Sequence, residues 1–211
     1  MSGQPDDTAS GSESGPVWAG PAKPGEIPRL IAIHRDGIPY SFNSRLGQEH
    51  MALVYDVVMS DPASIVLAAR IRDAPVGVCI ATLDADALSR MLMRRFSFAH
   101  WKMIACAALR SPRLVANWLE NAWVGRPVYH RGNAVRACLF AIAVDRTVRS
   151  RGIGASLVHG VDEFCRNAGC LAYRLDTRAD NQGAQRFYQR EGFAHVGQRG
   201  RNTIWIRELV Q

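Results

Sequence analysis

The segment from Leu139 to Leu157 limits the fold of this chain more than any other. Residues Leu139 to Val144 are apolar and predict a buried strand, which leads into a basic turn with two glycines, Gly152 and Gly154. The spacing of apolar residues after the turn is that of an amphipathic helix. The first N–H groups of such a helix have no intrahelical partner, and the helix dipole favours anions beside them. Because glycine lets a ligand approach the backbone closely, this turn predicts a site for a pyrophosphate-containing cofactor.

Two other phosphate-binding loops do not fit this segment. A Walker loop requires a lysine after its last glycine, and no lysine follows here. A dinucleotide fingerprint requires a third glycine at the position that Leu157 occupies. Taken alone, the segment leaves one further alternative open, in which the glycine turn only joins a strand to a helix.

The order of the other expected elements combines strands with helices throughout the chain. Strands alternate with helices after residue 136, so part of the sheet is expected to be parallel, and the last two strands predict an antiparallel pair. A turn at Arg72 to Ala74 predicts a hairpin. The expected strands are 30–33, 64–71, 75–83, 136–144, 171–176, 193–197 and 203–209, and the expected helices are 42–59, 152–168 and 181–190, with two or three more in 84–131, broken near Ser97 and Pro112.

The N-terminal segment differs in composition from the rest. Residues 1–26 are rich in glycine, serine, proline and aspartate and have no apolar periodicity, which predicts a disordered tail. Residues 27–211 are expected to form a single domain, in keeping with the length of 211 residues and the 47% of apolar residues.

Charge and cysteine content narrow the class of protein. The net charge of +7 suits an anionic ligand, a nucleic acid or an acidic membrane surface, but no helix-turn-helix or aromatic-basic strand motif supports nucleic-acid binding. The odd count of five cysteines, without a C-x-x-C pair, predicts reduced, buried thiols in a cytoplasmic protein and no metal site. We find no apolar run near the roughly 20 residues that span a bilayer and no signal peptide.

Two motifs carry a resemblance to a known family. Residues 149–154, Arg-Ser-Arg-Gly-Ile-Gly, match R/Q-x-x-G-x-G/A and resemble the acyl-CoA-binding motif of the GCN5-related N-acetyltransferase (GNAT) superfamily. Residues 181–193 resemble its second motif, N-x-x-A-x-x-F-Y-x-x-x-G-F. Asn181 and Tyr188 are seven residues apart and therefore share one helix face, while Phe187 is expected to point toward the core. An ordinary surface tyrosine is the alternative for Tyr188.

The resemblance implies a fold and a cofactor. The fold would be α+β, with a central mixed, largely antiparallel sheet splayed between two parallel strands, flanked by helices and extended by a helical insertion at 84–131. The co-substrate would be acetyl-CoA, without a metal. Its pantetheine would pair with strand backbone, its pyrophosphate would rest on N–H groups of the turn, and arginines would add charge. The implied cofactor-binding residues are Ile142, Ala143, Val144, Arg149, Arg151, Gly152, Ile153, Gly154, Ala155 and Asn181.

The resemblance also implies direct attack of a neutral primary amine on the thioester. Tyr188 would be the catalytic residue, which protonates or holds the departing thiolate, and Cys138 is not expected to act as a nucleophile. Many relatives have a glutamate on the strand before the turn, but residues 137–143 contain none. The general base therefore stays unassigned among Asp84, Asp86, His100, His130 and a water chain. The missing glutamate also leaves a non-catalytic acyl-CoA sensor or interaction module as the alternative function.

The block 84–131 is expected to lie on the acceptor side. It combines apolar residues with arginines, which fits a peripheral contact with an anionic membrane, a pocket for a phosphorylated acceptor, or a helical lid or dimer face. Through this block the chain resembles acetyltransferases of bacterial polysaccharide synthesis. A small-molecule amine or an amino sugar is expected as acceptor rather than a protein, and a homodimer is left open.

Overall fold

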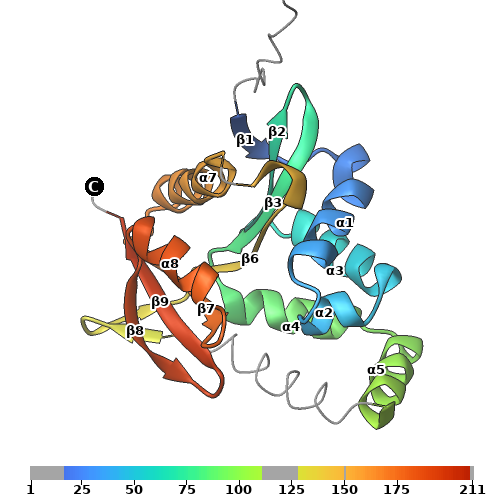
Figure 1. Ribbon diagram of the computed structural model, residues 1–211. Coiled ribbons are helices and arrows are strands. Elements are labelled where there is room, and N and C mark those ends of the chain that lie inside the picture. The colour runs from blue at the N-terminus through green and yellow to red at the C-terminus, as the bar shows by residue number, and fades with distance from the viewer. Residues whose placement is uncertain (1–16, 111–127, 150, 210–211) are drawn as a thin grey trace, which may run out of the picture.

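A seven-stranded mixed sheet organises the computed structural model, which describes residues 17–110, 128–149 and 151–209 (Figure 1). The strand order is β1-β2-β3-β6-β7-β9-β8, and every neighbouring pair is antiparallel except β6 and β7. The strands are β1 (Val17–Pro21), β2 (Ser64–Ile71), β3 (Ala74–Thr82), β6 (Cys138–Val144), β7 (Ala172–Arg178), β8 (Ala194–Arg199) and β9 (Asn202–Glu208). The largely antiparallel α+β fold expected from the sequence is therefore confirmed.

Helices cover both faces of the sheet. Successive side chains of β2 point to opposite faces of the sheet. Leu67 and Ala69 pack in one core with α7, and Val66 and Ala68 pack in a second core with α1 and α3. The helices are α1 (Ile27–Gly37), α2 (Phe42–Arg45), α3 (Gln48–Ser60), α4 (Ala85–Arg95), α5 (Phe98–Arg110), α7 (Ile153–Asn167) and α8 (Gln182–Arg190). Figure 1 shows α7 and α8 on the side of the sheet opposite to α1 and α3.

The parallel strands β6 and β7 diverge. Their register joins only Cys138 with Arg174, and the Arg174 N–H donates to the Ala137 carbonyl over 3.0 Å. All other neighbouring strands pair along at least five positions. The sheet thus consists of two parts that meet at one end of β6, and Figure 1 shows the gap between them opening toward α7 and α1.

A buried ion pair fixes the second part of the sheet to α7. Asp162 is fully buried and accepts hydrogen bonds from Nε and Nη2 of Arg207 at 2.7 and 2.6 Å, and from the Tyr173 hydroxyl at 2.8 Å. Such fork-shaped pairing satisfies both carboxylate oxygens. The same guanidinium donates to the Glu191 carbonyl at the end of α8. Arg207 on β9 therefore holds both helices that border the gap.

Order begins earlier than the sequence predicts. Residues 17–26, expected within the disordered tail, form β1 and the 3₁₀ turn η1 (Pro24–Glu26), whereas residues 1–16 lie outside the described residues. β1 pairs with β2, and the Trp18 ring lies 4.5 Å from the buried guanidinium of Arg70. Arg70 in turn binds Glu26, with Nε to Oε1 at 2.7 Å. Pairing with a distant strand gives this short segment its order, and local composition does not report that pairing.

Several other element predictions need correction. Residues 30–33, expected as a strand, lie inside α1, where Leu30, Ile31 and Ile33 are buried and Pro28 lies in the first turn. A short apolar run does not by itself separate strand from buried helix. The helix expected at 42–59 is divided at Gly47, whose φ of 96° is left-handed.

The block 84–131 is only partly helical. Helices α4 and α5 lie where expected, with the break at Ser97, but residues 128–135 form a hairpin of β4 (Val128–His130) and β5 (Asn133–Val135). The break expected at Pro112 and any third helix lie outside the described residues. The other strands and helices expected from the sequence are found within about two residues of their predicted bounds.

Candidate functional site

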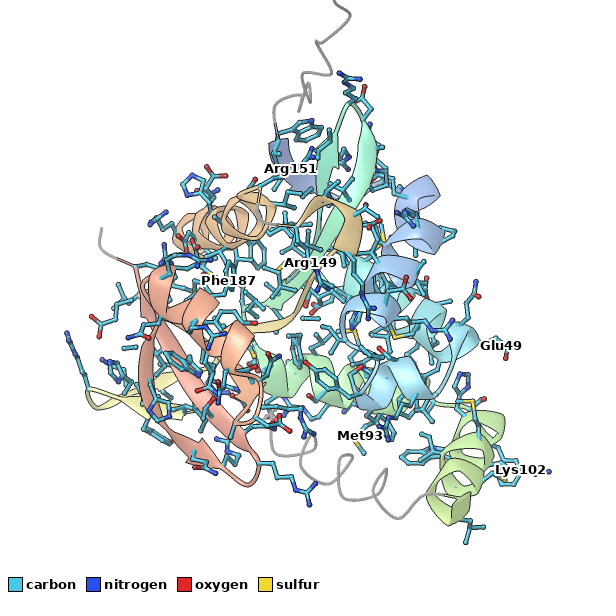
Figure 2. The ribbon with its side chains drawn as sticks, viewed as in Figure 1. Glu49, Met93, Lys102, Arg149, Arg151 and Phe187 are labelled. Carbon is cyan, nitrogen blue, oxygen red and sulfur yellow. The ribbon has the colours of Figure 1, made fainter. Side chains whose placement is uncertain are left out.

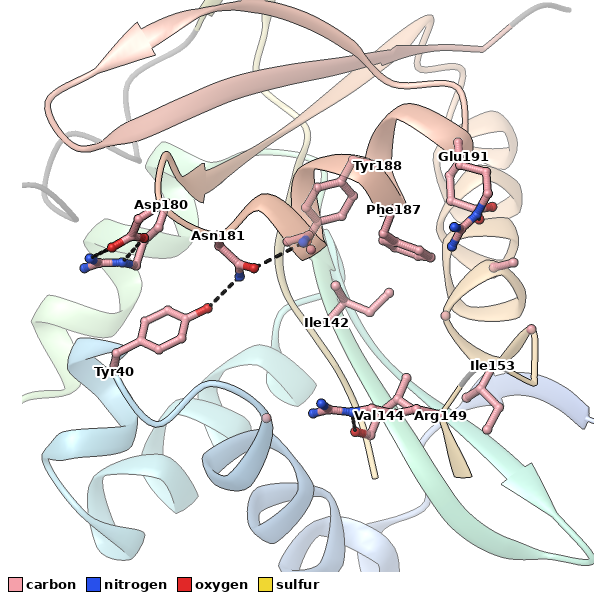
Figure 3. Close-up of a pocket in the computed structure, with 18 of the residues that line it drawn as sticks. Tyr40, Ile142, Val144, Arg149, Ile153, Asp180, Asn181, Phe187, Tyr188 and Glu191 are labelled. Atoms are coloured by element: carbon pink, nitrogen blue, oxygen red, sulfur yellow. Dashed lines mark hydrogen bonds and ion pairs between the residues drawn. The ribbon is translucent and has the colours of Figure 1, made fainter. Parts of the chain in front are cut away.

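One large cavity of about 1470 Å³ opens where β6 and β7 diverge. Its walls come from segments far apart in sequence: the region from α1 to α2, strand β6, the turn before α7, and the segment from the end of β7 through α8. Figure 3 shows Ile142 and Tyr188 in its middle, with Tyr40 and Asp180 toward one end and Ile153, Phe187 and Glu191 toward the other. We call these the Asp180 end and the Ile153 end.

The glycine turn forms the Ile153 end. Gly152 is the N-cap of α7 with a φ of 75°, and Ile153 is buried in the core beneath it. The Ser156 N–H donates to the Gly152 carbonyl over 3.0 Å, so this helix starts at the turn, and the N–H groups of Ile153, Gly154 and Ala155 belong to its first turn. Gly152, Ile153, Gly154 and Ala155 all line the cavity. The arrangement presents free backbone donors and the positive end of a four-turn helix to it.

The two arginines of the turn differ in position. Arg149 lines the cavity, and its Nε lies 3.4 Å from the Val144 carbonyl. Arg151 is exposed and does not belong to the cavity lining that the described residues form. Figure 2 shows Arg149 near the gap and Arg151 near β1, away from it. Of the two predicted cationic side chains, the structure brings only Arg149 to the cavity.

Strand β6 forms one long side of the cavity. Ile142 and Val144 point into it, whereas Ala143 points to the opposite face, against Gly37 of α1. A Cβ at Gly37 would lie 2.7 Å from the Ala143 Cβ, so glycine is required for α1 to approach the strand this closely. Ala143 can therefore meet a ligand in the cavity only through its backbone.

Asn181 closes the start of α8. Its Oδ1 accepts a hydrogen bond from the Ala184 N–H at 3.1 Å, which makes it the N-cap, and its Nδ2 donates to the Tyr40 hydroxyl at 3.1 Å. Both groups of the amide thus have protein partners, and Figure 3 shows the amide between Tyr40 and α8. The contact with a ligand that the sequence predicts for Asn181 stays a prediction.

Tyr188 lies in the middle of the cavity wall. Its side chain is only 7% exposed, and its ring contacts Phe193 and Phe187. Burial raises the pKa of its hydroxyl, so the group is protonated at neutral pH and can donate a hydrogen bond. Within the described part of the chain this hydroxyl has no hydrogen-bond partner, although the rest of the ring is packed. It is suited to donate to a ligand.

Phe187 packs against the core, as the sequence predicts, and also lines the cavity. It is half-buried and lies across the start of α7, where a Cβ at Gly154 would come within 3.0 Å of its Cε2 and Cζ atoms. The short helix α8 turns Tyr188 inward, and the preceding residue, Phe187, therefore faces the glycine turn. A small residue at Gly154 thus allows both ligand access to the backbone and close contact with Phe187.

The Asp180 end carries charges that the sequence analysis does not single out. Arg45, Arg178 and Arg201 line it together with Asp180. Arg178 binds both Asp180 oxygens, with Nε to Oδ1 at 2.8 Å, and its guanidinium lies 5.5 Å from the centre of the Tyr40 ring. These residues come from separate loops without a shared motif, so no local signal in the sequence identifies them.

The general-base candidates lie elsewhere. Asp84 is the N-cap of α4, Asp86 pairs with Arg90, His100 contacts Ser97, and His130 contacts Glu208 at 2.8 Å. The described residues of 84–131 do not belong to the cavity lining, and residues 111–127 lie outside the described residues, so the acceptor role of this block stays a prediction. Asp180 and Glu191 are the carboxylates that line the cavity.

The cysteines match the expected chemistry in part. All five cysteines are free; three are buried, but Cys106 is exposed, contrary to prediction. Burial raises the pKa of Cys138 to about 11, so this thiol stays protonated at neutral pH. Among the described residues no three histidines, cysteines or carboxylates are grouped as a metal site would require. In the same part of the chain no helix has both the length and the apolar character to cross a bilayer.

Comparison with known proteins gives a family match over most of the chain. Residues 30–193 match the family model described as the acetyltransferase (GNAT) family. Over 99 residues the chain is 27% identical to N-alpha-acetyltransferase 30 of Schizosaccharomyces pombe, which covers 47% of this chain and 63% of that protein. A second relative, YdhI of Bacillus subtilis, is 36% identical over 52 residues, 25% of this chain and 32% of its own. The matches therefore span less than two thirds of each relative.

Solved structures share the fold at low sequence identity. The PaiA N-acetyltransferase of Thermoplasma acidophilum, solved in complex with coenzyme A, has a TM-score of 0.57 at 12% identity, covering 92% of this chain and 99% of that one. NAA60 of Arabidopsis thaliana, solved in complex with acetyl-CoA, has a TM-score of 0.57 at 17% identity with the same coverage. The likeness extends over nearly the whole of each chain.

Proposed function

Because the chain belongs to the GNAT family of acetyltransferases, we propose that it transfers an acetyl group from acetyl-CoA directly to a primary amine of a small molecule. One observation carries the proposal: the glycine turn Gly152–Ala155 and the buried phenol of Tyr188 line the same cavity. The first feature suits a diphosphate, and the second suits a departing sulfur. Their combination in one cavity supports transfer chemistry rather than phosphate binding alone.

The Ile153 end has the chemistry that acetyl-CoA requires. The N–H groups of Ile153, Gly154 and Ala155 are in the first turn of α7, where the helix dipole adds to their attraction for a diphosphate. Arg149 adds a positive charge on the same side. The diverging edges of β6 and β7 offer backbone groups without strand partners to an extended arm that carries amides. These features fit the cofactor without any need for a metal.

The reaction that fits this site has no covalent enzyme intermediate. The lone pair of a neutral amine attacks the thioester carbonyl carbon, the C–S bond breaks, and the nitrogen loses one proton. Tyr188 supplies a proton to the departing thiolate and regains one from solvent. The protonated Cys138 thiol is unsuited to attack, which favours direct transfer.

The proton from the amine has no obvious side-chain acceptor. Asp180 is exposed and bound by Arg178, which lowers the pKa of its carboxyl and makes it a weak base. Glu191 is the other carboxylate at the cavity, at the opposite end. A water chain from the Asp180 end therefore suits this step best, and we propose no catalytic base among the side chains.

A second candidate acceptor is the N-terminus of a protein. The Schizosaccharomyces pombe relative is named an N-alpha-acetyltransferase, and the match to it supports this candidate. The link from Asn181 to Tyr40 joins the two walls at the Asp180 end and narrows the path for a peptide, which favours a small acceptor. The non-catalytic acyl-CoA sensor remains the competing function.

One experiment separates these functions. Calorimetry with acetyl-CoA tests the cofactor site, and release of free thiol in the presence of a panel of polyamines, amino sugars, amino acids and short peptides tests transfer. Binding with turnover of small amines supports the proposal, and turnover of peptides alone supports the protein acceptor. Binding without turnover, unchanged by Tyr188→Phe, would support the sensor. Absence of binding would reject the proposal.

A further inference from the structure

The Asp180 end of the cavity carries more positive than negative charge. Three arginines, Arg45, Arg178 and Arg201, line it, against the single carboxylate of Asp180. Arg178 occupies both oxygens of that carboxylate. Asp180 also feels the charge of Arg201, so the three arginines exceed the one carboxylate by two positive charges at this end. The Arg45 side chain is exposed and makes no hydrogen bond or ion pair within residues 17–110, 128–149 and 151–209.

The two remaining arginines come from opposite walls. Arg45 ends the short helix α2, which starts at Phe42, two residues after Tyr40. Arg201 lies in the turn between β8 and β9, and its carbonyl accepts a hydrogen bond from the Ala179 N–H at 2.8 Å, which holds it next to Asp180. The hydrogen bond from Asn181 to Tyr40 joins the same two walls. Arg45 and Arg201 thus flank one opening.

This charge is separate from the region that suits the cofactor. Figure 3 shows Asp180 and Tyr40 at one end, Ile153 and Glu191 at the other, and Ile142 and Tyr188 between them. A diphosphate on the glycine turn takes the Ile153 end, and a thioester beside Tyr188 takes the middle. The Asp180 end is left for the acceptor.

From this arrangement we infer that the acceptor carries an anionic group, a carboxylate or a phosphate, close to its amine, and that Arg45 and Arg201 bind this group. The inference rests on the proposed function. A guanidinium can donate two parallel hydrogen bonds to two oxygens of a carboxylate or a phosphate, and its charge repels a purely cationic amine such as a polyamine. An acceptor with both charges brings its amine to the thioester while its anion stays between the arginines. Arg45 and Arg201 are therefore specificity-determining residues.

Matched pairs of acceptors test the inference. The probes are β-alanine against β-alaninamide, phosphoethanolamine against ethanolamine, and glucosamine 6-phosphate against glucosamine, each assayed with saturating acetyl-CoA for kcat/KM of thiol release. Rates are compared per neutral amine, because the anion changes the amine pKa. We expect kcat/KM to be about tenfold or more higher for the anionic member of at least one pair, and the best pair distinguishes carboxylate from phosphate.

Variants assign the preference to residues. Arg45→Gln and Arg201→Gln should each reduce the anionic preference about tenfold and leave acetyl-CoA affinity unchanged. Arg94→Gln is the matched control, because Arg94 is an exposed arginine of α4 outside the cavity lining and the variant loses the same charge. Thermal unfolding of each variant checks that the fold persists, and a destabilised variant is replaced by Arg45→Lys or Arg201→Lys, which retain charge but lose the fork.

Three results would overturn the inference. One is an equal or lower kcat/KM for the anionic member of every pair. Another is a preference that Arg45→Gln and Arg201→Gln leave unchanged. A third is a loss of acetyl-CoA affinity in these variants, which would assign both arginines to the cofactor. If acetyl-CoA binds but no amine or peptide is acetylated, the proposed function fails, and this inference fails with it. If amines are acetylated without a preference for anionic acceptors, only the inference is rejected.

Discussion

The Nδ2 atom of Asn181 lies 3.1 Å from the Tyr40 hydroxyl and donates a hydrogen bond to it. Asn181 is the N-cap of α8, and Tyr40 lies between α1 and α2, so the bond connects the two walls of the cavity beyond the point where β6 and β7 separate. The Asn181 side chain therefore both caps the start of α8 and holds the wall that carries Tyr40 close to α8.

The two tasks of Asn181 can be separated by substitution. Asn181→Ala should lower the free energy of unfolding by about 1 kcal/mol, because it removes the N-cap of α8. Asn181→Ser retains a capping oxygen but does not reach Tyr40, so it should behave as Tyr40→Phe does. Urea unfolding of the single and double variants measures this. Additive effects of Asn181→Ser and Tyr40→Phe would show that the bond across the walls contributes nothing.

Gly154 should tolerate no large or charged side chain. Its Cβ would come within 3.0 Å of the Phe187 ring, and the side chain would stand among the N–H groups that face the cavity. We expect Gly154→Ala to change acetyl-CoA affinity little, because the family motif accepts alanine at this position and the Phe187 ring can shift, and Gly154→Glu to abolish binding by adding like charge. Gly197→Ala is the control, because no atom lies within 4 Å of its Cβ position and its φ is ordinary. Unchanged affinity of Gly154→Glu in calorimetry would remove the diphosphate assignment.

Tyr188→Phe should affect rate but not stability. The hydroxyl has no partner within the described part of the chain, so its loss leaves packing intact and the melting temperature unchanged. Loss of a proton donor should lower kcat about a hundredfold, with little change in acetyl-CoA affinity. Steady-state kinetics and calorimetry measure the two effects. A drop in affinity at constant kcat would mean that the phenol only packs against the cofactor.

Two buried histidines predict how stability depends on pH. Burial lowers the pKa of His34 and of His50 to about 4, and in His50 the nearby charge of His100 acts in the same direction. In the unfolded chain both titrate near 6.5. As pH falls below about 6.5, the unfolded state gains protons that the native state does not, so the free energy of unfolding falls by up to about 1.4 kcal/mol per pH unit for each histidine.

Denaturant unfolding between pH 7 and pH 5 tests this expectation above the range in which carboxylates titrate. His34→Gln should reduce the dependence of the unfolding free energy on pH, because it removes one of the titrating groups. The glutamine amide can still bond to the Tyr55 hydroxyl, which lies 3.1 Å from Nδ1 of His34, so the packing is retained. His159→Gln is the control, because that histidine is exposed. A slope that is flat in the original protein, or unchanged in His34→Gln, would contradict the assignment.

The sequence predicts the cofactor side of the cavity well, because that side depends on local patterns. The strand at Leu139 to Val144, the glycine turn and the helix after it are consecutive, and the apolar spacing reports each of them. Asn181 and Tyr188 share a helix, so their spacing alone brings both to one cavity. Phe187 packs against the core as expected, but the same spacing does not tell that its ring also meets the glycine turn and lines the cavity.

The acceptor side could not be predicted in this way. Tyr40 and Asn181 are 141 residues apart in sequence, and Arg45, Arg178 and Arg201 come together only through the register of β7 with β9 and the position of α2. The acceptor role expected for 84–131 from its composition stays a prediction, because composition does not say where a block packs. The homodimer and the contact of this block with a membrane stay predictions.

Because β6 diverges from β7, the sheet has more unpaired strand edges, here called margins, than its strand order suggests. Besides the outer margins at β1 and β8, the strands β6 and β7 each have an inward margin beyond the pairing of Cys138 with Arg174. Exposed margins invite chain-to-chain association, and proteins counter it with short strands, proline and charge. The outer strands carry Pro21 and Arg199, respectively. The inner margins of β6 and β7 are instead shielded from other chains by the cavity walls. A substitution that widens the cavity therefore risks self-association as well as lost activity.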